Sequence, residues 1–167
     1  PLADYYRGIA PELQAARDRQ AAVQKSLADM KPYTTVPGMR DLAEAAQGNG
    51  ARGPLWGVPI VIKANTSIKG QVTTAGWEGF RRPGHELVAP KDATVVAKFK
   101  AAGAIIVGHT NMPDLANSDT NRSSSFGRTG NAYDVRFSPG GSSGGTVTAL
   151  AANMAVLGNG TDTGNSI

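Results

Sequence analysis

Two serines in glycine-rich surroundings and one distant lysine are the residues of this sequence whose types favour covalent chemistry. Ser142 lies in the glycine-rich run 140–145, Ser166 follows a second such segment, 160–165, and Lys63 lies far upstream. A serine hydroxyl becomes a nucleophile when a neighbouring base removes its proton. Glycines let backbone N–H groups approach a reacting atom closely. The three residues therefore predict a site for nucleophilic catalysis.

The predicted support for the lysine is a pair of parallel strands. The apolar run 58–62 is typical of a strand buried on both faces, and Lys63 ends it. Residues 92–102 predict a helix with Asp92 as its cap, and residues 104–107 predict a second strand. A strand, a helix and a strand in this order indicate parallel pairing. In such a sheet we expect the site at the strand ends.

A helix of small residues is predicted over 144–157. It places Ser142 and Ser143 at its N-terminus, where free backbone N–H groups favour developing negative charge. Two further helices are predicted near the start of the chain, over 11–31 and 39–47. Helices and buried strands together indicate an α/β protein.

Composition excludes several other classes of function. The 167 residues contain no cysteine, which excludes disulfides, thiol catalysis and cysteine-ligated metals. No other metal-binding motif is present, so we expect no metal and no cofactor. The net charge of +4 comes from scattered basic residues, which predicts no nucleic-acid partner. No apolar run approaches the ~20 residues of a membrane-spanning helix, so we expect no membrane partner. The sequence leaves the compartment open, and a soluble, cytoplasmic protein is favoured.

Taken together, the motifs resemble the amidase signature family, serine hydrolases that cleave carboxamides with a Ser–cisSer–Lys triad. The resemblance covers roughly residues 53–167. Besides the lysine and the two serine motifs, it rests on the segments 53–59, 103–111 and 130–134. It implies an α/β fold whose core is a mixed, largely parallel β-sheet covered by helices, incomplete in this chain.

Members of that family are much longer than this chain. The resemblance therefore implies that residues 1–167 are the N-terminal part of a single amidase domain, with a peripheral helical segment over 1–50 and a catalytic core segment over 51–167. It also implies that the remainder of the amidase chain is a partner of this polypeptide. Homo-oligomerisation is left open.

The resemblance assigns a role to each site residue. Ser166 would attack the amide carbonyl, and Ser142, which the family holds after a cis peptide bond, would pass the serine proton to a neutral Lys63. Residue chemistry alone leaves Ser143 open for that relay, and the family pattern selects Ser142. The oxyanion hole would be formed by the backbone N–H groups of Thr163, Gly164, Asn165 and Ser166. The substrate would be bound by Met112, Gly141 and Asp162.

The predicted reaction is hydrolysis of a carboxamide C–N bond to a carboxylate and ammonia or an amine, through an acyl-enzyme on Ser166. The substrate would be a small-molecule or peptide amide. A glutamine-hydrolysing subunit of a tRNA-dependent amidotransferase shares the triad and is the second candidate. The third is a non-enzymatic module that holds phosphate in the run 140–145. The run lacks the Gly-Lys-Ser/Thr ending of a phosphate loop, which disfavours this third candidate.

Asp162 also has a second interpretation that needs no substrate. An aspartate in a turn accepts hydrogen bonds from backbone N–H groups a few residues along the chain. In that role Asp162 would hold the loop that positions Ser166. The residue type leaves both interpretations of Asp162 open.

Overall fold

The computed structural model describes residues 53–162 and 164, together with positions 11, 14 and 18. Contacts divide the chain into two compact units, Pro1–Asp41 and Leu42–Ile167, and the fold described below belongs to the second unit. The helix predicted over 39–47 lies outside the described residues. Of the helix predicted over 11–31, the three described residues are helical.

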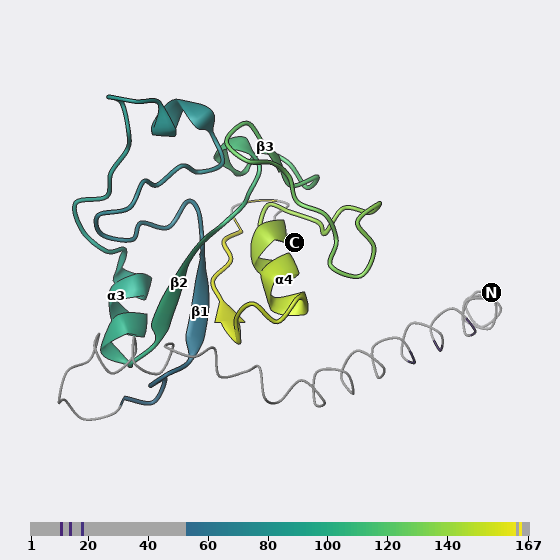
Figure 1. Cartoon of the computed structure of the whole chain (residues 1–167), viewed down its shortest axis with the longest axis horizontal. Helices are drawn as coiled ribbons and strands as arrows, with labels where there is room; N and C mark the ends of the chain where they lie inside the picture. Colours follow the sequence, from purple (N-terminus) through teal and green to yellow (C-terminus); the bar gives the residue numbers. More distant parts are fainter. Residues whose placement is uncertain (1–10, 12–13, 15–17, 19–52, 163, 165–167) are drawn as a thin grey trace. The chain divides into compact units, whose positions relative to one another are not determined.

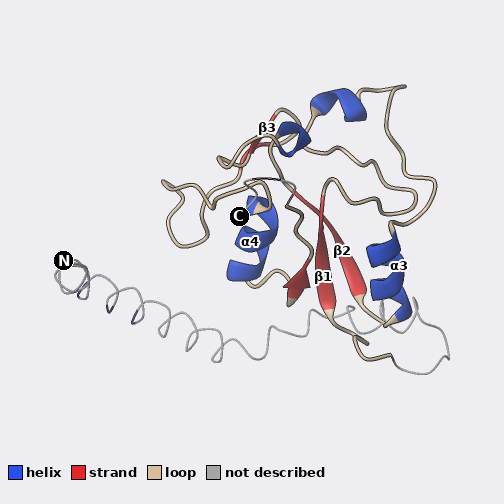
Figure 2. Cartoon of the chain, turned by 180° about the vertical axis from the view of Figure 1, so that it is seen from behind, coloured by secondary structure: helices blue, strands red, loops and turns tan. Residues whose placement is uncertain are grey.

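A three-stranded parallel sheet lies at the centre of the described part of the second unit (Figures 1 and 2). Its strands, in spatial order, are β2 (Ile105–Thr110), β1 (Pro59–Lys63) and β5 (Leu157–Gly158). The register pairs Lys63 with Thr110 at the ends of their strands. Both predicted strands are confirmed, and β2 continues to Thr110. Because the strands are parallel, their carboxyl ends meet at one edge of the sheet.

Two helices cover opposite faces of this sheet (Figure 2). They are α3 (Thr94–Ala101) and α4 (Gly144–Ala151). α3 packs against the face of β1 that carries Ile60 and Ile62, and α4 packs against Val61. Successive side chains of a strand point to opposite faces, so Lys63 shares the α4 face with Val61. The predicted α/β class, with a largely parallel sheet covered by helices, is confirmed.

The N-terminus of α3 corrects one expectation from the sequence. Asp92 does not cap the helix, because the N-cap residue is Ala93 and no side chain caps it. The Asp92 carboxylate instead accepts the backbone N–H of Lys69 at 2.8 Å and pairs with the Lys100 ammonium at 2.9 Å. These two partners hold the carboxylate away from the first-turn N–H groups of the helix.

The helix predicted over 144–157 is wrong in its second half. α4 ends at Ala151, and Asn153 takes a left-handed backbone conformation with a φ of 57°. The chain then pairs with β1, where the Val156 N–H donates to Pro59 O at 3.1 Å. The apolar residues at the end of the predicted helix have helical spacing, but pairing with β1 stabilises this segment more than a further helical turn would. The segment therefore joins the sheet.

Two long connections from the strand ends carry much of the remaining described chain. Their elements are η2 (Glu78–Arg81), η3 (Asp114–Ala116), β3 (Arg122–Ser123) and β4 (Gly127–Arg128). The connections touch where the Leu115 N–H donates to Ala75 O at 2.8 Å. Gly76 is required there, because a Cβ would overlap the backbone oxygen of Met112. No helix among the described residues is long and apolar enough to cross a membrane.

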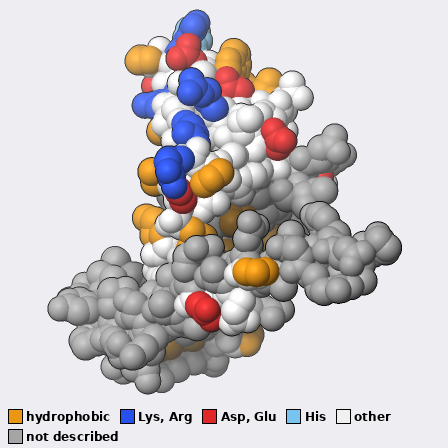
Figure 3. Space-filling model, turned by 90° about the vertical axis from the view of Figure 1, so that its right-hand side faces the viewer, with side chains coloured by type: hydrophobic (Ala, Val, Ile, Leu, Met, Phe, Trp, Pro, Cys, Tyr) orange, Lys and Arg blue, Asp and Glu red, His pale blue; other side chains and the backbone are white. Residues whose placement is uncertain are grey.

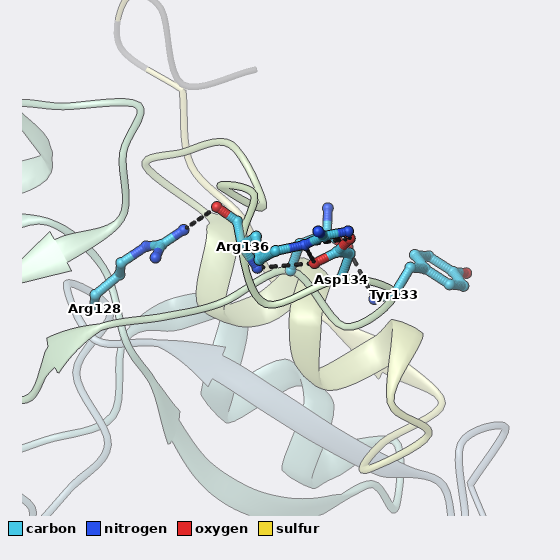
Figure 4. A network of polar contacts seen from close by, with 5 residues as sticks. Arg128, Tyr133, Asp134 and Arg136 are labelled. Atoms are coloured by element: carbon cyan, nitrogen blue, oxygen red, sulfur yellow. Dashed lines mark hydrogen bonds and ion pairs between the residues drawn. The ribbon is translucent and has the colours of Figure 1, made fainter.

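The segment that leads into the glycine-rich run is held by polar contacts (Figure 4). Arg128 Nη2 donates to the backbone oxygens of Arg136 and Phe137, both at 3.0 Å. Asp134 pairs with Arg136 at 2.6 Å. These contacts tie the segment to β4.

Lysine and arginine side chains lie in a column on the face shown in Figure 3, with acidic and hydrophobic side chains beside them. Several basic side chains of the described part have partners of the opposite charge or an aromatic ring. Lys100 pairs with Asp92, and the Arg81 guanidinium lies 4.7 Å from the centre of the Phe126 ring. The basic side chains are therefore mixed with acidic and hydrophobic side chains.

Candidate active site

Lys63 and Ser142 meet at the carboxyl edge of the sheet, with 2.6 Å between Lys63 Nζ and Ser142 Oγ. Both side chains are completely buried. Lys63 is the last residue of β1 and faces α4, and the chain enters α4 directly after Ser143. The fold thus brings together two of the three predicted triad residues, from segments far apart in the sequence.

The Lys63 amine has two further oxygen neighbours. Its Nζ lies 2.9 Å from Ser143 Oγ and 3.0 Å from the backbone oxygen of Thr161. The backbone N–H of Lys63 donates to Asn159 Oδ1 at 2.7 Å. The end of β1 is therefore tied both to the glycine-rich run and to the segment that follows β5.

Polar side chains that the sequence did not single out hold this segment in place. Asn65 Nδ2 donates to Thr161 Oγ1 at 2.9 Å, and Asn159 Nδ2 donates to Thr66 Oγ1 at 2.9 Å. Thr146, in the first turn of α4, donates to Asn159 O at 3.1 Å. Asn65, Thr66, Asn159 and Thr161 lie within three residues after the end of β1 or β5, and that position in an α/β sheet is the signal that could have identified them.

Burial lowers the pKa of the Lys63 ammonium below its ordinary value, and the nearby Asp162 carboxylate opposes this shift. The charged form loses its hydration when the side chain is enclosed, so the neutral amine is favoured. A neutral amine is the form that accepts a proton. The environment of Lys63 therefore favours a role as a base.

The lowered pKa predicts a pH-dependent contribution of Lys63 to stability. In the unfolded chain the amine has a pKa of about 10.4, so between the folded and unfolded values the unfolded state binds more protons. The free energy of unfolding of the wild type then rises with pH in that window. The free energy of unfolding of Lys63→Met minus that of the wild type should be largest below the folded-state pKa of Lys63. This difference should decrease as the pH rises toward ~10. Denaturant unfolding of both proteins across pH measures this, and a pH-independent difference would contradict the lowered pKa.

The glycines of the run 140–145 are required by close neighbours. A Cβ at Gly141 would lie 2.9 Å from Ser118 O, and a Cβ at Gly145 would overlap the backbone oxygen of Asn111. The peptide bond between Gly141 and Ser142 is cis, as the resemblance implied. The run is therefore enclosed by the connection between β2 and α4.

Gly145→Ala should destabilise the protein by about 3 kcal/mol, because the new methyl group meets backbone atoms that cannot move independently. Gly70→Ala is the matched control. Its Cβ would enter open space, and only its φ of 78° opposes the substitution, at a cost of about 1 kcal/mol. Thermal and denaturant unfolding compare the two variants. Equal losses would show that the contact with Asn111 does not confine the run.

An open hollow of ≈ 640 Å³ lies beside the glycine-rich run. Its lining residues are Ala116, Asn117, Ser118, Asp119, Gly140, Gly141 and Gly164. Two of the predicted site residues, Gly141 and Gly164, thus line one hollow. Met112 is completely buried and is not among the lining residues, so the structure does not bring its side chain to this space.

Asp162 occupies the turn position that its residue type suggested. Its Oδ1 accepts the backbone N–H of Gly164 at 2.8 Å. The other predicted residues of this loop, Thr163, Asn165 and Ser166, lie outside the described residues. Among the residues that the structure describes, no three histidine, aspartate or glutamate side chains gather where they could hold a metal ion.

Similarity to known proteins covers most of the chain. The family model for Amidase matches residues 13–167. The chain is 46% identical over 128 residues to the putative amidase AmiB2 of Mycobacterium tuberculosis, which covers 75% of this chain and 27% of that protein. It is 38% identical over 161 residues to a glutamyl-tRNA(Gln) amidotransferase subunit of Lachnoclostridium phytofermentans, covering 92% and 32%.

The fold matches a solved structure as well. The native peptide amidase from Stenotrophomonas maltophilia superposes with a TM-score of 0.64 at 35% identity, covering 78% of this chain and 28% of that chain. This likeness confirms the fold that the resemblance implied. The chain spans about a quarter to a third of the length of these relatives.

Proposed function

Because this chain belongs to the Amidase family, we propose that the protein hydrolyses a carboxamide C–N bond to a carboxylate and ammonia or an amine. The observation that carries the proposal is the buried contact of 2.6 Å between Lys63 Nζ and Ser142 Oγ. A lysine with a lowered pKa beside a serine hydroxyl is a base with a proton relay. The nucleophile in this proposal is Ser166.

The proposed reaction begins when Ser166 Oγ bonds to the amide carbonyl carbon. The Ser166 proton passes to Ser142, and the Ser142 proton passes to the neutral Lys63 amine. The proton then returns along the same route to the leaving nitrogen, the C–N bond breaks, and an acyl ester remains on Ser166. Water attacks this ester by the same proton route, which releases the carboxylate and restores the serine hydroxyl.

The negative charge on the carbonyl oxygen needs backbone donors. We propose that the N–H groups of Thr163, Asn165 and Ser166 supply them, because the Gly164 N–H already donates to Asp162. One such donor stabilises the transition state by about 2.7–4 kcal/mol in enzymes of this general type. The substrate is proposed to bind in the hollow that Gly141 lines.

The general test measures ammonia or amine release by the intact protein from aliphatic amides, aromatic amides, peptide C-terminal amides and glutamine. Release with equal formation of carboxylate is the expected result. A folded protein that releases nothing from any of these classes would contradict the proposed reaction. The preferred class then identifies the acyl and amine groups that the site accepts.

A glutamine-hydrolysing subunit is the second candidate, favoured by the 38% identity over 92% of this chain to a glutamyl-tRNA(Gln) amidotransferase subunit. Such a subunit should hydrolyse glutamine faster when its partner subunits and charged tRNA are added. A stand-alone amidase should show the same rate without them. Comparing the two rates separates the candidates.

We further propose that the active protein contains the remainder of the amidase chain and takes a small-molecule or peptide amide. Residues 1–50 would be its peripheral helical segment and residues 51–167 the first part of its catalytic core. We propose that it works in the cytoplasm without a nucleic acid, membrane, metal or cofactor as partner. Gel filtration with light scattering determines whether it also self-associates.

A further inference from the structure

We propose that Asn159 is a positioning residue for the Lys63 amine. Its side chain replaces a backbone acceptor at the end of β1, and this lets the following segment bring Thr161 O to that amine. The proposal rests on the proposed function, because it concerns the base of that reaction. It follows from the hydrogen bonds of Asn159, which connect the end of β1, the turn after β1 and α4.

The backbone N–H of Asn159 continues the parallel pairing of β5 with β1. It donates to Val61 O at 3.2 Å. In a parallel pair, a residue whose N–H bonds to the neighbouring strand offers its C=O to the N–H two residues farther along that strand. The next bond of a regular ladder would therefore run from the Lys63 N–H to Asn159 O.

A side-chain hydrogen bond replaces this ladder bond. The Lys63 N–H donates to Asn159 Oδ1 at 2.7 Å, whereas Asn159 O accepts the Thr146 hydroxyl of α4 at 3.1 Å. A backbone N–H can only donate, so the amide oxygen of Asn159 must face Lys63. Asn159 Nδ2 then donates to Thr66 Oγ1 at 2.9 Å. The side chain thus satisfies the buried end of β1 while the backbone of Asn159 turns toward α4.

This turn of the backbone brings the next residues to the Lys63 amine. A Cβ at Gly160 would lie 3.0 Å from Ser143 Oγ, so the segment passes close to the N-terminus of α4. Thr161 O then lies 3.0 Å from Lys63 Nζ. In a continued ladder this carbonyl would instead face the backbone beyond Lys63. An acceptor at this place holds one N–H of the amine, so Asn159 acts on the base through Thr161.

The test begins with Asn159→Leu in the intact protein. Leucine has a similar size but no acceptor, so the buried Lys63 N–H either loses its partner or bonds to the backbone oxygen of residue 159. In either case the segment that carries Thr161 O is no longer held at the amine. kcat should fall by about 10–100-fold with KM nearly unchanged, since Asn159 is not among the residues that line the hollow. The acidic limb of the pH–rate profile should move to lower pH, because the ammonium form loses an acceptor.

Asn159→Asp should restore turnover at high pH. Its carboxylate accepts the Lys63 N–H, and the Thr66 hydroxyl can rotate and donate to it. The added negative charge favours the ammonium form, so the acidic limb should move to higher pH, opposite to Asn159→Leu. Above this limb kcat should lie within about fivefold of the wild type. The Asp162 carboxylate, which also acts on Lys63, is present in every variant. A loss as large as that of Asn159→Leu at every pH would overturn the proposal.

Thr66→Val is the matched control for the loss of a polar contact at the same amide. It removes the partner of Asn159 Nδ2 but keeps the bond from the Lys63 N–H to Asn159 Oδ1. Its kcat should fall by no more than about threefold, and its acidic limb should stay at the wild-type pH. A loss equal to that of Asn159→Leu would assign the effect to the polar network as a whole and overturn the proposal. An unshifted limb in Asn159→Leu would overturn it as well.

Two further experiments keep the proposal testable in other circumstances. If Asn159→Leu does not fold, Asn159→Ser, whose hydroxyl is one bond shorter than the amide, should give the same loss and the same shift of the limb. If the wild type hydrolyses no amide, crystal structures of the wild type and Asn159→Leu test the role without turnover. Thr161 O should lie beyond hydrogen-bond distance of Lys63 Nζ in the variant. An unmoved Thr161 O would overturn the role of Asn159, whereas absent hydrolysis alone contradicts the proposed function.

Discussion

Ser166→Ala is expected to lower amide turnover by about 10³–10⁶-fold in the intact protein. Loss of the nucleophile removes the covalent route, and only substrate binding and the oxyanion donors continue to assist hydrolysis. The effect should fall on kcat, because the hollow beside the glycine-rich run is unchanged. Steady-state kinetics with the preferred amide measures it.

A fluorophosphonate probe tests the same assignment chemically. The probe bonds to an activated serine, so mass spectrometry should find it on Ser166 in the wild type and nowhere in Ser166→Ala. Ser142→Ala is the comparison, since Ser142 is proposed to relay a proton without bonding to the substrate. A label that persists in Ser166→Ala and disappears in Ser142→Ala would assign the nucleophile to Ser142.

The second large effect is expected at the base. Lys63→Ala should lose about 10³–10⁴-fold in turnover near neutral pH, and part of the activity should return at high pH, where hydroxide replaces the missing base. Lys63→Arg should not restore activity, because a guanidinium keeps its proton at any pH that the protein tolerates. The pH–rate profiles of the three proteins measure this.

Folding must be controlled in this series, because Lys63 is completely buried and its amine has three oxygen neighbours. Thermal unfolding of each variant separates a catalytic loss from a structural one. A folded Lys63→Arg protein with near-normal turnover would rule out a neutral base at this position.

Local sequence was sufficient where one kind of residue dominates a segment. The apolar run before Lys63 predicted a buried strand, and β1 indeed ends at Lys63. The strand, helix and strand order predicted parallel pairing, and the register of β1 with β2 confirms it. The glycine-rich run predicted close backbone approach, and Gly145 lies against Asn111.

Local sequence was insufficient where the partners of a residue lie outside the segment that contains it. Asp92 had the type of a helix cap, but Lys69 and Lys100 engage its carboxylate. The apolar residues at the end of the predicted helix over 144–157 had helical spacing, but this end of the segment forms β5 and pairs with β1. Lys69 lies 23 residues from Asp92 along the chain, and β1 lies farther still from the end of the predicted helix, so no local pattern includes these two partners.

The sequence by itself determined the chemical groups of this protein and the strand that ends at its lysine, because residue type and local period are properties of short segments. Only the tertiary structure decided that Lys63 and Ser142 meet. They lie 79 residues apart in the chain, both side chains are completely buried, and 2.6 Å separates Lys63 Nζ from Ser142 Oγ. A contact between residues so far apart depends on the packing of the sheet and its helices, and folding alone brings the two groups together.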